Sequence, residues 1–375
     1  MAEYLTNTAD LTAVANAIRE KGGTSEQLAC PDGFVTAIQA IQTGAPLQIA
    51  VTTNAGATVT ATKGSKTVSG TADASGNCTL TVDEAGTWTV TAATASTTKT
   101  TDVVVGISNV DLVLADSVLN NNSWETIKKV SDAGQGENYW SIGDRKEVTL
   151  NGTVGHLSLS NYKTYAFIIG FNHNASVEGA NRIHFQLAKT ALSGGKDVCL
   201  CDSSYGFNVS TTGYFSMNSS QTNSGGWKSS QMRTNICGTS LSSYSGTIIA
   251  VIPEALRAVL KSVTKYTDNI AGGSAGISNI TATTDYFFLL SEFEVFGSIS
   301  YGNTNEKNKQ VQYAYYSAGN SKIKYKHDGT STAAHWHLRS PCVRYSGYFV
   351  IVHAKGTVNA DGAYASYGFA PGFCI

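Results

Sequence analysis

Two histidines near the C-terminal end have the spacing of metal ligands. His335 and His337 are two residues apart, so in an extended segment both imidazoles project from one side, as two ligands of a zinc site would. A third ligand could come from His327, His353 or Asp361, but none of these has a fixed sequence spacing to the pair. The sequence leaves a metal site open and favours a protein without a metal or cofactor.

Two glutamates, Glu292 and Glu294, are also two residues apart. On one strand their carboxylates would share a face, and a pair of carboxylates is what a glycosidase uses. Residues this close on one strand rarely bracket a sugar by themselves. The alternative, which we favour, is a scaffold role in which the carboxylates accept hydrogen bonds.

Seven cysteines are scattered along the chain without a C-x-x-C pair, at positions 30, 78, 199, 201, 237, 342 and 374. We expect free, mostly buried thiols rather than a disulfide framework. Cys199 and Cys201 would share one strand face, but no second pair of metal-ligand residues accompanies them.

The N-terminal 44 residues predict two short helices. Apolar residues recur at helical spacing from Asp10 to Glu20, and again from Phe34 to Ile41 after Pro31. Two such helices cannot enclose a core alone. We therefore expect residues 1–44 to pack on copies of themselves or on a larger assembly.

Residues 45–106 change to strict alternation of apolar and polar residues. About six short strands separated by turns such as Asn54-Ala55-Gly56 predict a small all-β sandwich. Its predicted surface is almost entirely Thr, Ser and Ala, without clustered His, Cys or carboxylates. We interpret this segment as a spacer.

Residues 107–375 predict one long α+β domain with interleaved helices and strands. Helices are expected over Trp124–Val130, Trp227–Ile236 and Pro253–Val263. Strands are expected over Tyr165–Gly170, Asp285–Leu290 and Gly347–Val352.

Charge and hydropathy exclude some classes of partner. The formal net charge is -1, whereas a protein that depends on phosphate contacts has a basic excess, so we expect no nucleic-acid binding. No run approaches the roughly 18 apolar residues of a membrane span, and the first residues lack the pattern of an export signal. We expect no membrane insertion.

Several short sequence motifs resemble segments of known protein families. Residues 10–23 (DLTAVANAIREKGG) followed by residues 30–38 (CPDGFVTAI) resemble a module at the front of bacteriophage tail proteins, and residues 45–106 are similar to the immunoglobulin-like repeats of tail fibres. The rest resembles a family of gut-bacterial and phage proteins with a C-type-lectin-like fold. The words that carry this resemblance are ENYWSIG (137–143), ANRIHF (180–185), NSGGWKS (223–229), LLSEFEVF (289–296), LRSP (338–341) and GFAPGFC (368–374).

Several members of that family are variable proteins of diversity-generating retroelements. The resemblance implies a fixed framework that displays a surface diversified mainly at Asn codons, in a variable region of about residues 335–369. Residues that such diversification cannot produce, namely Lys, Gln, Glu, Met and Trp, occur between Cys342 and Phe369 only at Lys355. The implied contact residues, rich in the aromatic, Arg and His side chains of binding hot spots, are His335, His337, Arg344, Tyr345, Tyr348, Phe349, Ile351, His353, Asn359, Asp361, Tyr364, Tyr367 and Phe369.

Two of these residues have an equally good alternative interpretation. Phe349 and Ile351 could be core residues of a strand instead of displayed side chains. If Val350 and Val352 face inward, alternation places Phe349, Ile351 and His353 outward together.

Together the resemblances predict a non-enzymatic receptor-binding protein of a phage tail, made in the bacterial cytoplasm and carried on the virion. Its expected partners are a protein or glycan of the host-cell surface, other tail or baseplate proteins, and two further copies in a homotrimer. One alternative is a bacterial surface adhesin that uses the same face. Another is an oxidase of the formylglycine-generating type, which would need Cys342 and Cys374 as a reactive pair near the surface.

Overall fold

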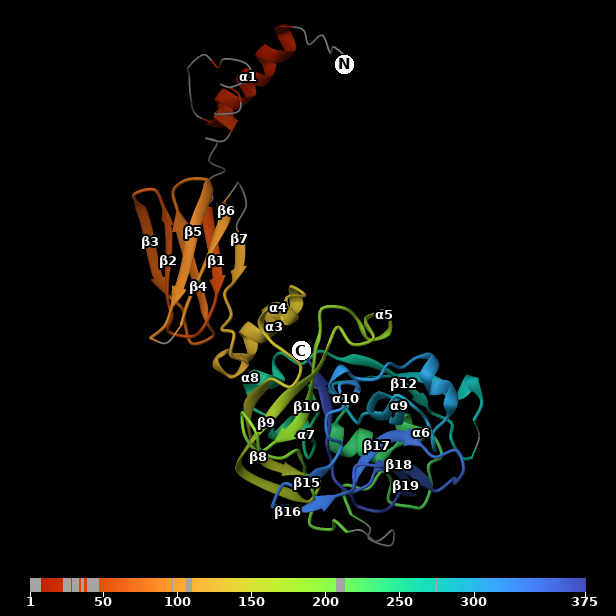
Figure 1. Ribbon diagram of the computed structural model, residues 1–375. Helices are drawn as coiled ribbons and strands as arrows, with labels where there is room; N and C mark the ends of the chain where they lie inside the picture. The colour runs from red at the N-terminus through yellow and green to blue at the C-terminus, as the bar shows by residue number, and fades with distance from the viewer. Residues whose placement is uncertain are drawn as a thin grey trace. The chain divides into compact units, whose positions relative to one another are not determined.

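The computed structural model describes residues 8–22, 28, 34, 37–38, 47–95, 97–105, 110–206, 213–273 and 275–375 (Figure 1). The chain divides into two compact units, residues 1–114 and 115–375. Both are rich in β-structure, and the protein is a mostly β, multi-sheet chain with short helices. No helix in the described ranges combines the length and the apolar character that a membrane span requires.

The first unit begins with helix α1 (Thr8–Gly22), which confirms the helix predicted from Asp10 to Glu20. Ala15 and Ile18, three residues apart, are its buried apolar residues. The second predicted helix, from Phe34 to Ile41, lies outside the described residues apart from three helical positions.

Two sheets follow and enclose one apolar core. The strands are β1 (Leu47–Thr52), β2 (Thr58–Lys63), β3 (Lys66–Thr71), β4 (Asn77–Val82), β5 (Gly86–Ala93), β6 (Thr98–Val105) and β7 (Val110–Val113). They form a sheet of order β4-β1-β7 and a sheet of order β3-β2-β5-β6. The alternating residues of the sequence, among them Ile49, Val59, Leu80, Trp88 and Val90, are buried together as predicted.

The predicted end of the sandwich at residue 106 is wrong. Strand β7 pairs in parallel with β1, from Ile49 opposite Val110 to Thr52 opposite Val113. Leu114 belongs to the same core. The unit therefore extends to residue 114 because the sheet needs β7 to cover the open edge of β1.

The described residues of the second unit form four sheets. Its strands are β8 (Arg145–Val154), β9 (Leu157–Phe171), β10 (Ile183–Lys189), β11 (Val198–Cys199), β12 (Val263–Asp268), β13 (Ile280–Asp285), β14 (Phe287–Phe288), β15 (Lys324–Lys326), β16 (Gly329–Ala334), β17 (Trp336–Pro341), β18 (Tyr348–Val352), β19 (Val358–Gly362) and β20 (Gly372–Cys374). The largest sheet has the order β14-β20-β10-β9-β8, and β17-β18-β19, β12-β13 and β11-β15-β16 form smaller ones. Figure 1 labels β8, β9 and β10 of the largest sheet and β17, β18 and β19 of a smaller one.

The helices of this unit are short. They are η1 (Leu119–Asn121), α3 (Trp124–Asp132), α4 (Gly136–Tyr139), α5 (Ala175–Glu178), α6 (Gly226–Ser229), the π-helix η2 (Met232–Cys237), α7 (Ile248–Val251), α8 (Glu254–Arg257), η3 (Ile277–Asn279), α9 (Glu292–Phe296), η4 (Thr304–Asn308) and α10 (Ala314–Ser317). The helix predicted at Trp124 is confirmed, with Ser123 as its N-cap.

Other predicted elements are shorter or divided. The helix expected over Trp227–Ile236 is split between α6 and η2, and the one expected over Pro253–Val263 is the single turn α8. Of the expected strands, Tyr165–Gly170 lies in β9 and Gly347–Val352 corresponds to β18. The expected strand Asp285–Leu290 is divided: Asp285 ends β13, and Phe287–Phe288 form β14.

Strand β20, near the C-terminal end of the sequence, lies inside the largest sheet. It pairs with β10 on one side and with β14 on the other. The ring of Phe373 stacks on Phe185 at 5.2 Å between centroids and lies 5.2 Å from the ring of Phe287. Segments almost 190 residues apart therefore form one core around Phe373.

Candidate binding surface

The predicted contact residues divide between the surface and the interior of the second unit. Exposed or half-buried are Arg344, Tyr345, Tyr348, His353, Asn359, Asp361 and Tyr364. Buried are His335, His337, Phe349, Ile351, Tyr367 and Phe369. The predicted display is wrong for this second group, because at most 8% of the surface of any member reaches solvent.

Phe349 and Ile351 are buried because strand β18 is covered on both of its faces. All four residues of Phe349–Val352 are 0% exposed, so neither face of the strand is open to solvent. Ile351 packs in a small core with Ala365 and Tyr367, which come from the segment after β19. Phe349 and Ile351 are therefore core residues, and alternation does not separate an inner from an outer face here.

His335, directly before β17, and His337, within it, project to one side, as their spacing predicts, but toward Tyr367 instead of solvent. The ring centroids of His335 and His337 lie 5.2 and 5.4 Å from that of Tyr367. The ring of His353 lies 4.3 Å from that of His335. Burial lowers the pKa of His337 to about 4, and burial with the nearby His353 lowers the pKa of His335 to about 4. Both rings are neutral near pH 7 and serve as packing groups.

The two exposed residues of the set, Arg344 and Tyr345, lie in residues 342–348, a segment called the Tyr345 turn below. It follows β17 and ends at Tyr348, the first residue of β18. Tyr345 is 56% exposed, and its ring centroid lies 5.1 Å from that of half-buried Tyr348. The guanidinium carbon of exposed Arg344 lies 5.4 Å from the ring centroid of Tyr301. Two rings and a cation are thus presented together at one end of the sheet.

One buried side chain, Asn223, fixes the backbone of this turn. Its amide nitrogen Nδ2 donates to the carbonyl oxygens of Cys342 (2.8 Å), Tyr345 (3.1 Å) and Tyr348 (2.8 Å). The backbone N–H of Asn223 donates to the carbonyl of Ser346 at 2.7 Å. Asn223 is 0% exposed, so these contacts are not in competition with water. The turn is therefore held in one conformation while its side chains remain in solvent.

Two glycines permit this close packing. A Cβ atom on Gly347 would lie 2.9 Å from the carbonyl oxygen of Gln221, and one on Gly362 would lie 2.7 Å from its Oε1. Strand residues Tyr348 and Gly362 are paired across β18 and β19. The side chain of Gln221 thus covers the glycines beside Tyr348, and a larger residue at Gly347 would displace the turn.

The remaining exposed or half-buried contact residues have local partners. The hydroxyl of Tyr367 donates to Asp361 Oδ2 at 2.7 Å. This hydrogen bond connects β19 to the buried ring of Tyr367. The Nδ1 atom of His353 accepts a hydrogen bond from the backbone N–H of Lys355 at 3.1 Å. Asn359, on β19, lies opposite Ile351 of β18.

Glu292 and Glu294 lie on helix α9, so the expectation that they share a strand is wrong. Ser291 caps the helix: its hydroxyl accepts from Glu294 N at 3.1 Å, and Glu294 Oε2 accepts from Ser291 N at 2.9 Å. The carboxylate of Glu292 accepts the backbone N–H groups of Tyr301 and Gly302. The scaffold role that we favoured for these carboxylates is confirmed.

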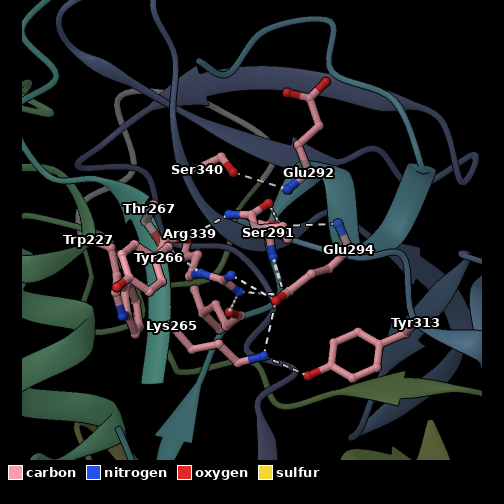
Figure 2. Close-up of polar contacts among 12 residues, drawn as sticks. Trp227, Lys265, Tyr266, Thr267, Ser291, Glu292, Glu294, Tyr313, Arg339 and Ser340 are labelled. Carbon is pink, nitrogen blue, oxygen red and sulfur yellow. Dashed lines mark hydrogen bonds and ion pairs between the residues drawn. The ribbon is translucent and has the colours of Figure 1, made fainter. Parts of the chain in front are cut away.

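Strand β17 also carries a residue of a buried ionic cluster, defined as Lys265, Glu178, Glu294 and Arg339. Figure 2 labels Lys265, Glu294 and Arg339 of this cluster. Arg339 donates to both carboxylate oxygens of Glu294, with Nη2 to Oε1 at 2.8 Å. Lys265 Nζ donates to Glu178 (2.7 Å), Glu294 (3.0 Å) and the hydroxyl of Tyr313 (2.8 Å). The four charged side chains are at most 4% exposed.

The pKa values of the two carboxyl groups move in opposite directions. Burial alone would raise the pKa of Glu294, but the charges of Arg339 and Lys265 outweigh it and hold that pKa well below its ordinary value. Burial raises the pKa of Glu178 to about 7, against the opposing charge of Lys265. Glu294 is therefore the permanent anion of the cluster.

Within the described residues, one group of three side chains has the arrangement of metal ligands: His173, Glu178 and Glu294. The ammonium of Lys265 already bonds both carboxylates of this group. Burial, together with the charge of Lys265, lowers the pKa of His173 to about 3. The cation required by the two glutamates is therefore supplied by the chain's own lysine.

The cysteines described by the structure are free and buried. The sulfur atoms of Cys199 and Cys201 lie 4.0 Å apart, on one side as their spacing predicts. Cys342 and Cys374 are both 0% exposed, so their expected position near the surface is wrong. Burial raises the pKa of Cys374 to about 12, which disfavours the reactive thiolate.

The family model of a domain of unknown function (DUF6273) matches residues 207–375. No curated protein matches the chain. The matched region includes Asn223, Arg339 and the whole Tyr345 turn. It does not include β10, with which β20 pairs, so the folded unit is longer than the matched domain.

Sequence reasoning missed the residues that hold the surface in place. Asn223 belongs to the NSGGWKS word, but its role depends on carbonyl groups about 120 residues away along the chain. Lys265 and Glu178 lie in segments that resembled nothing. The sequence did contain one usable signal, since Ser291 and Glu294 form the S-x-x-E pattern of a capping box.

Proposed function

We propose that this protein binds a partner on a cell surface without chemical turnover, and that the Tyr345 turn is its contact site. The observation that carries the proposal is the anchoring of an exposed turn by one buried asparagine. Asn223 holds three carbonyls of the turn, while Arg344 and Tyr345 stay exposed.

Rigid aromatic side chains suit a binding role for energetic reasons. A tyrosine on a fixed backbone loses few rotamers on binding and offers a large contact area with a polar tip. Arg344 adds a cation that can bond a carboxylate of the partner. The turn therefore combines the residue types that dominate binding hot spots with a preorganised backbone.

The wider context of the proposal comes from the sequence resemblances. We propose a phage-tail receptor-binding protein with a helical attachment module, an immunoglobulin-like spacer and a C-type-lectin-like head. The proposed assembly is a homotrimer on the virion, in which several copies raise the total affinity by avidity. The sandwich core described above gives the segment a folded body of its own, as a spacer needs.

Because several of the predicted contact residues are buried, fewer positions remain at which retroelement diversification could change the binding surface. The buried residues of the region, such as Phe349 and Tyr367, pack in the core and would not tolerate random replacement. We therefore propose that the variable positions are Arg344, Tyr345, Tyr348, His353, Asn359, Asp361 and Tyr364. A reverse transcriptase gene and an adenine-rich near-repeat beside the gene are the expected signs, and a locus with neither would remove diversification from the proposal.

Binding is tested with the full-length chain, fluorescently labelled, on a panel of bacterial strains by flow cytometry. The double variant Arg344→Ala/Tyr345→Ala should lower binding to a positive strain by about tenfold or more, with an unchanged melting temperature. Tyr214→Ala is the control, because Tyr214 is 50% exposed and lies outside the turn, against His156. Lack of binding to every strain, or equal binding by the double variant, would reject the proposed function.

The anchoring is tested separately with Asn223→Ala. Removing the amide takes away the donor shared by the carbonyls of Cys342, Tyr345 and Tyr348, of which the last two keep a backbone N–H donor. The loss should speed backbone hydrogen exchange in residues 342–348. Binding should fall although no contact side chain has changed. Mass spectrometry of purified phage particles tests the location, and detection on the bacterial surface instead would favour the adhesin alternative.

A further inference from the structure

A second loop, residues 268–279, lies against the Tyr345 turn and is described except for residue 274. The Oδ1 atom of Asn223, the same residue that anchors the turn, accepts the backbone N–H of Gly272 at 2.9 Å. Two residues further along the chain, Gly225 N donates to the carbonyl of Ile270 at 2.9 Å. One buried asparagine therefore connects both loops.

This loop presents large apolar side chains to solvent. Ile270 is 56% exposed and Ile277 is 67% exposed. The loop backbone is nevertheless well held, because the buried carboxylate of Asp268 accepts the N–H groups of Ile270 (3.1 Å) and Ala271 (2.8 Å). The N–H of Asn269 also donates to the carbonyl of Asn279 at 2.9 Å. The two isoleucines are thus exposed on an ordered backbone.

A third segment, residues 300–305, joins the first two. Asn303 Nδ2 donates to Asp268 Oδ2 (2.8 Å) and to the carbonyl of Gly276 (3.1 Å) in the isoleucine loop. On its other side, the carbonyl of Tyr301 accepts the N–H of Val343 in the Tyr345 turn at 2.9 Å. Hydrogen bonds therefore link the three segments, and their side chains Ile270, Ile277, Tyr301, Arg344 and Tyr345, which are exposed or half-buried, are named the composite face.

The composite face has almost no charge. In residues 268–279, 300–305 and 342–348 the charged side chains are Asp268, which is buried, and Arg344. Isoleucine has no hydrogen-bonding group and no flat ring to stack on a sugar, so exposed isoleucines add little to glycan recognition. They do add apolar area that a protein partner can bury.

We propose that the composite face binds a protein, through a contact patch that offers apolar side chains to Ile270 and Ile277 and a carboxylate to Arg344. This inference rests on the proposed function and specifies its partner class. It also extends the contact site to a loop that ends about 60 residues before the C-terminal segment predicted from the sequence. The loop supplies an apolar contact shared by all variants of the turn.

The experiment uses the full-length chain on a strain that it binds in a Tyr345-dependent manner. Ile270→Asp/Ile277→Asp should reduce binding by about tenfold or more, since a carboxylate in an apolar contact remains without a partner. Leu192→Asp is the matched control: Leu192 is 45% exposed in the same unit, beside Arg145 and Ser117 in a separate hollow. Melting temperatures should be equal for all three proteins, because the replaced side chains are on the surface.

The partner class is tested on the same cells. Protease treatment should abolish binding, whereas periodate oxidation of surface sugars should leave it intact. The reverse pattern, or full binding by the isoleucine variant, would overturn this inference while the Tyr345-dependent binding, and with it the proposed function, would stand.

Discussion

The two units of this protein have cores of different chemical character. In the sandwich, the buried cluster consists of apolar side chains such as Val59 and Trp88, and the charged residues Lys66 and Asp83 pair in solvent. In the second unit, Lys265 and Arg339 are buried against glutamates. The sandwich needs only the correct alternation of residue types, whereas the second unit needs particular pairs. This difference explains why the alternation of residue types in the sequence predicts the core of the sandwich but does not predict the core of the second unit.

The largest expected effect comes from breaking the ionic cluster. Arg339→Met leaves Glu294 buried with one of its two cations missing, which should lower the stability of the second unit by about 3–5 kcal/mol. Differential scanning calorimetry should show a lower melting temperature for that unit and an unchanged transition for the sandwich.

The double variant Arg339→Met/Glu294→Met tests whether the loss comes from the unpaired charge. It should recover part of the stability, because a buried pair replaced by apolar groups leaves less uncompensated charge. Lys128→Ala is the surface control, since the Lys128–Asp132 pair is solvent-exposed and should contribute less than about 0.5 kcal/mol. An Arg339→Met protein as stable as the parent would refute the distinction between the two cores.

An intermediate effect is expected from His337 and depends on pH. Its pKa is about 4 in the folded protein against 6.5 for an ordinary histidine, so the unfolded chain takes up the proton first as the pH falls. The stability contributed by the neutral ring is complete above pH 6.5 and is lost as the pH falls from 6.5 to 4. At pH 5 the loss should be about 2 kcal/mol for this residue.

The measurement compares urea unfolding of the parent and of His337→Gln at pH 7 and pH 5. The variant should lose about 2 kcal/mol less than the parent over this interval. His156→Gln, at an exposed histidine, serves as the control. Equal pH dependence in parent and His337→Gln would show that the ring of His337 is not held neutral.

The smallest effect is expected in the sandwich. Ile49→Val removes one methylene group from the apolar core and should cost about 1 kcal/mol, seen as a lower melting temperature of that unit alone. Val104→Ala, at a residue that is 70% exposed, should stay within about 0.5 kcal/mol of the parent. A larger loss from Val104→Ala than from Ile49→Val would contradict the assignment of the core.

The sequence predicted those parts whose structure depends on neighbours in the chain. Alternation located the sandwich core, helical spacing located α1, and Ser123 marked the start of α3. It failed where distant segments decide. Nothing local indicates that Tyr367 returns to cover Ile351, and this contact turned predicted surface residues into core.

Contacts between distant segments of the chain also limit the prediction of the binding surface. Arg344, Tyr345 and Tyr348 were among the predicted contact residues and do reach solvent, wholly or in part. Asn223, which fixes their backbone, and the isoleucine loop beside them could not be assigned, because their proximity arises from the tertiary fold. The expected strand at Glu292 was wrong, because Ser291 and Glu294 form a capping box that starts helix α9.

The parallel pairing of β1 with β7 has a mechanical consequence. In a parallel pair, the beginning of the first strand and the end of the second lie at opposite ends of the ladder. A force that pulls these two points apart loads the hydrogen bonds between the strands simultaneously, in shear, instead of opening them one after another. The sandwich can therefore resist stretching along its strands with all bonds of the β1–β7 ladder acting together.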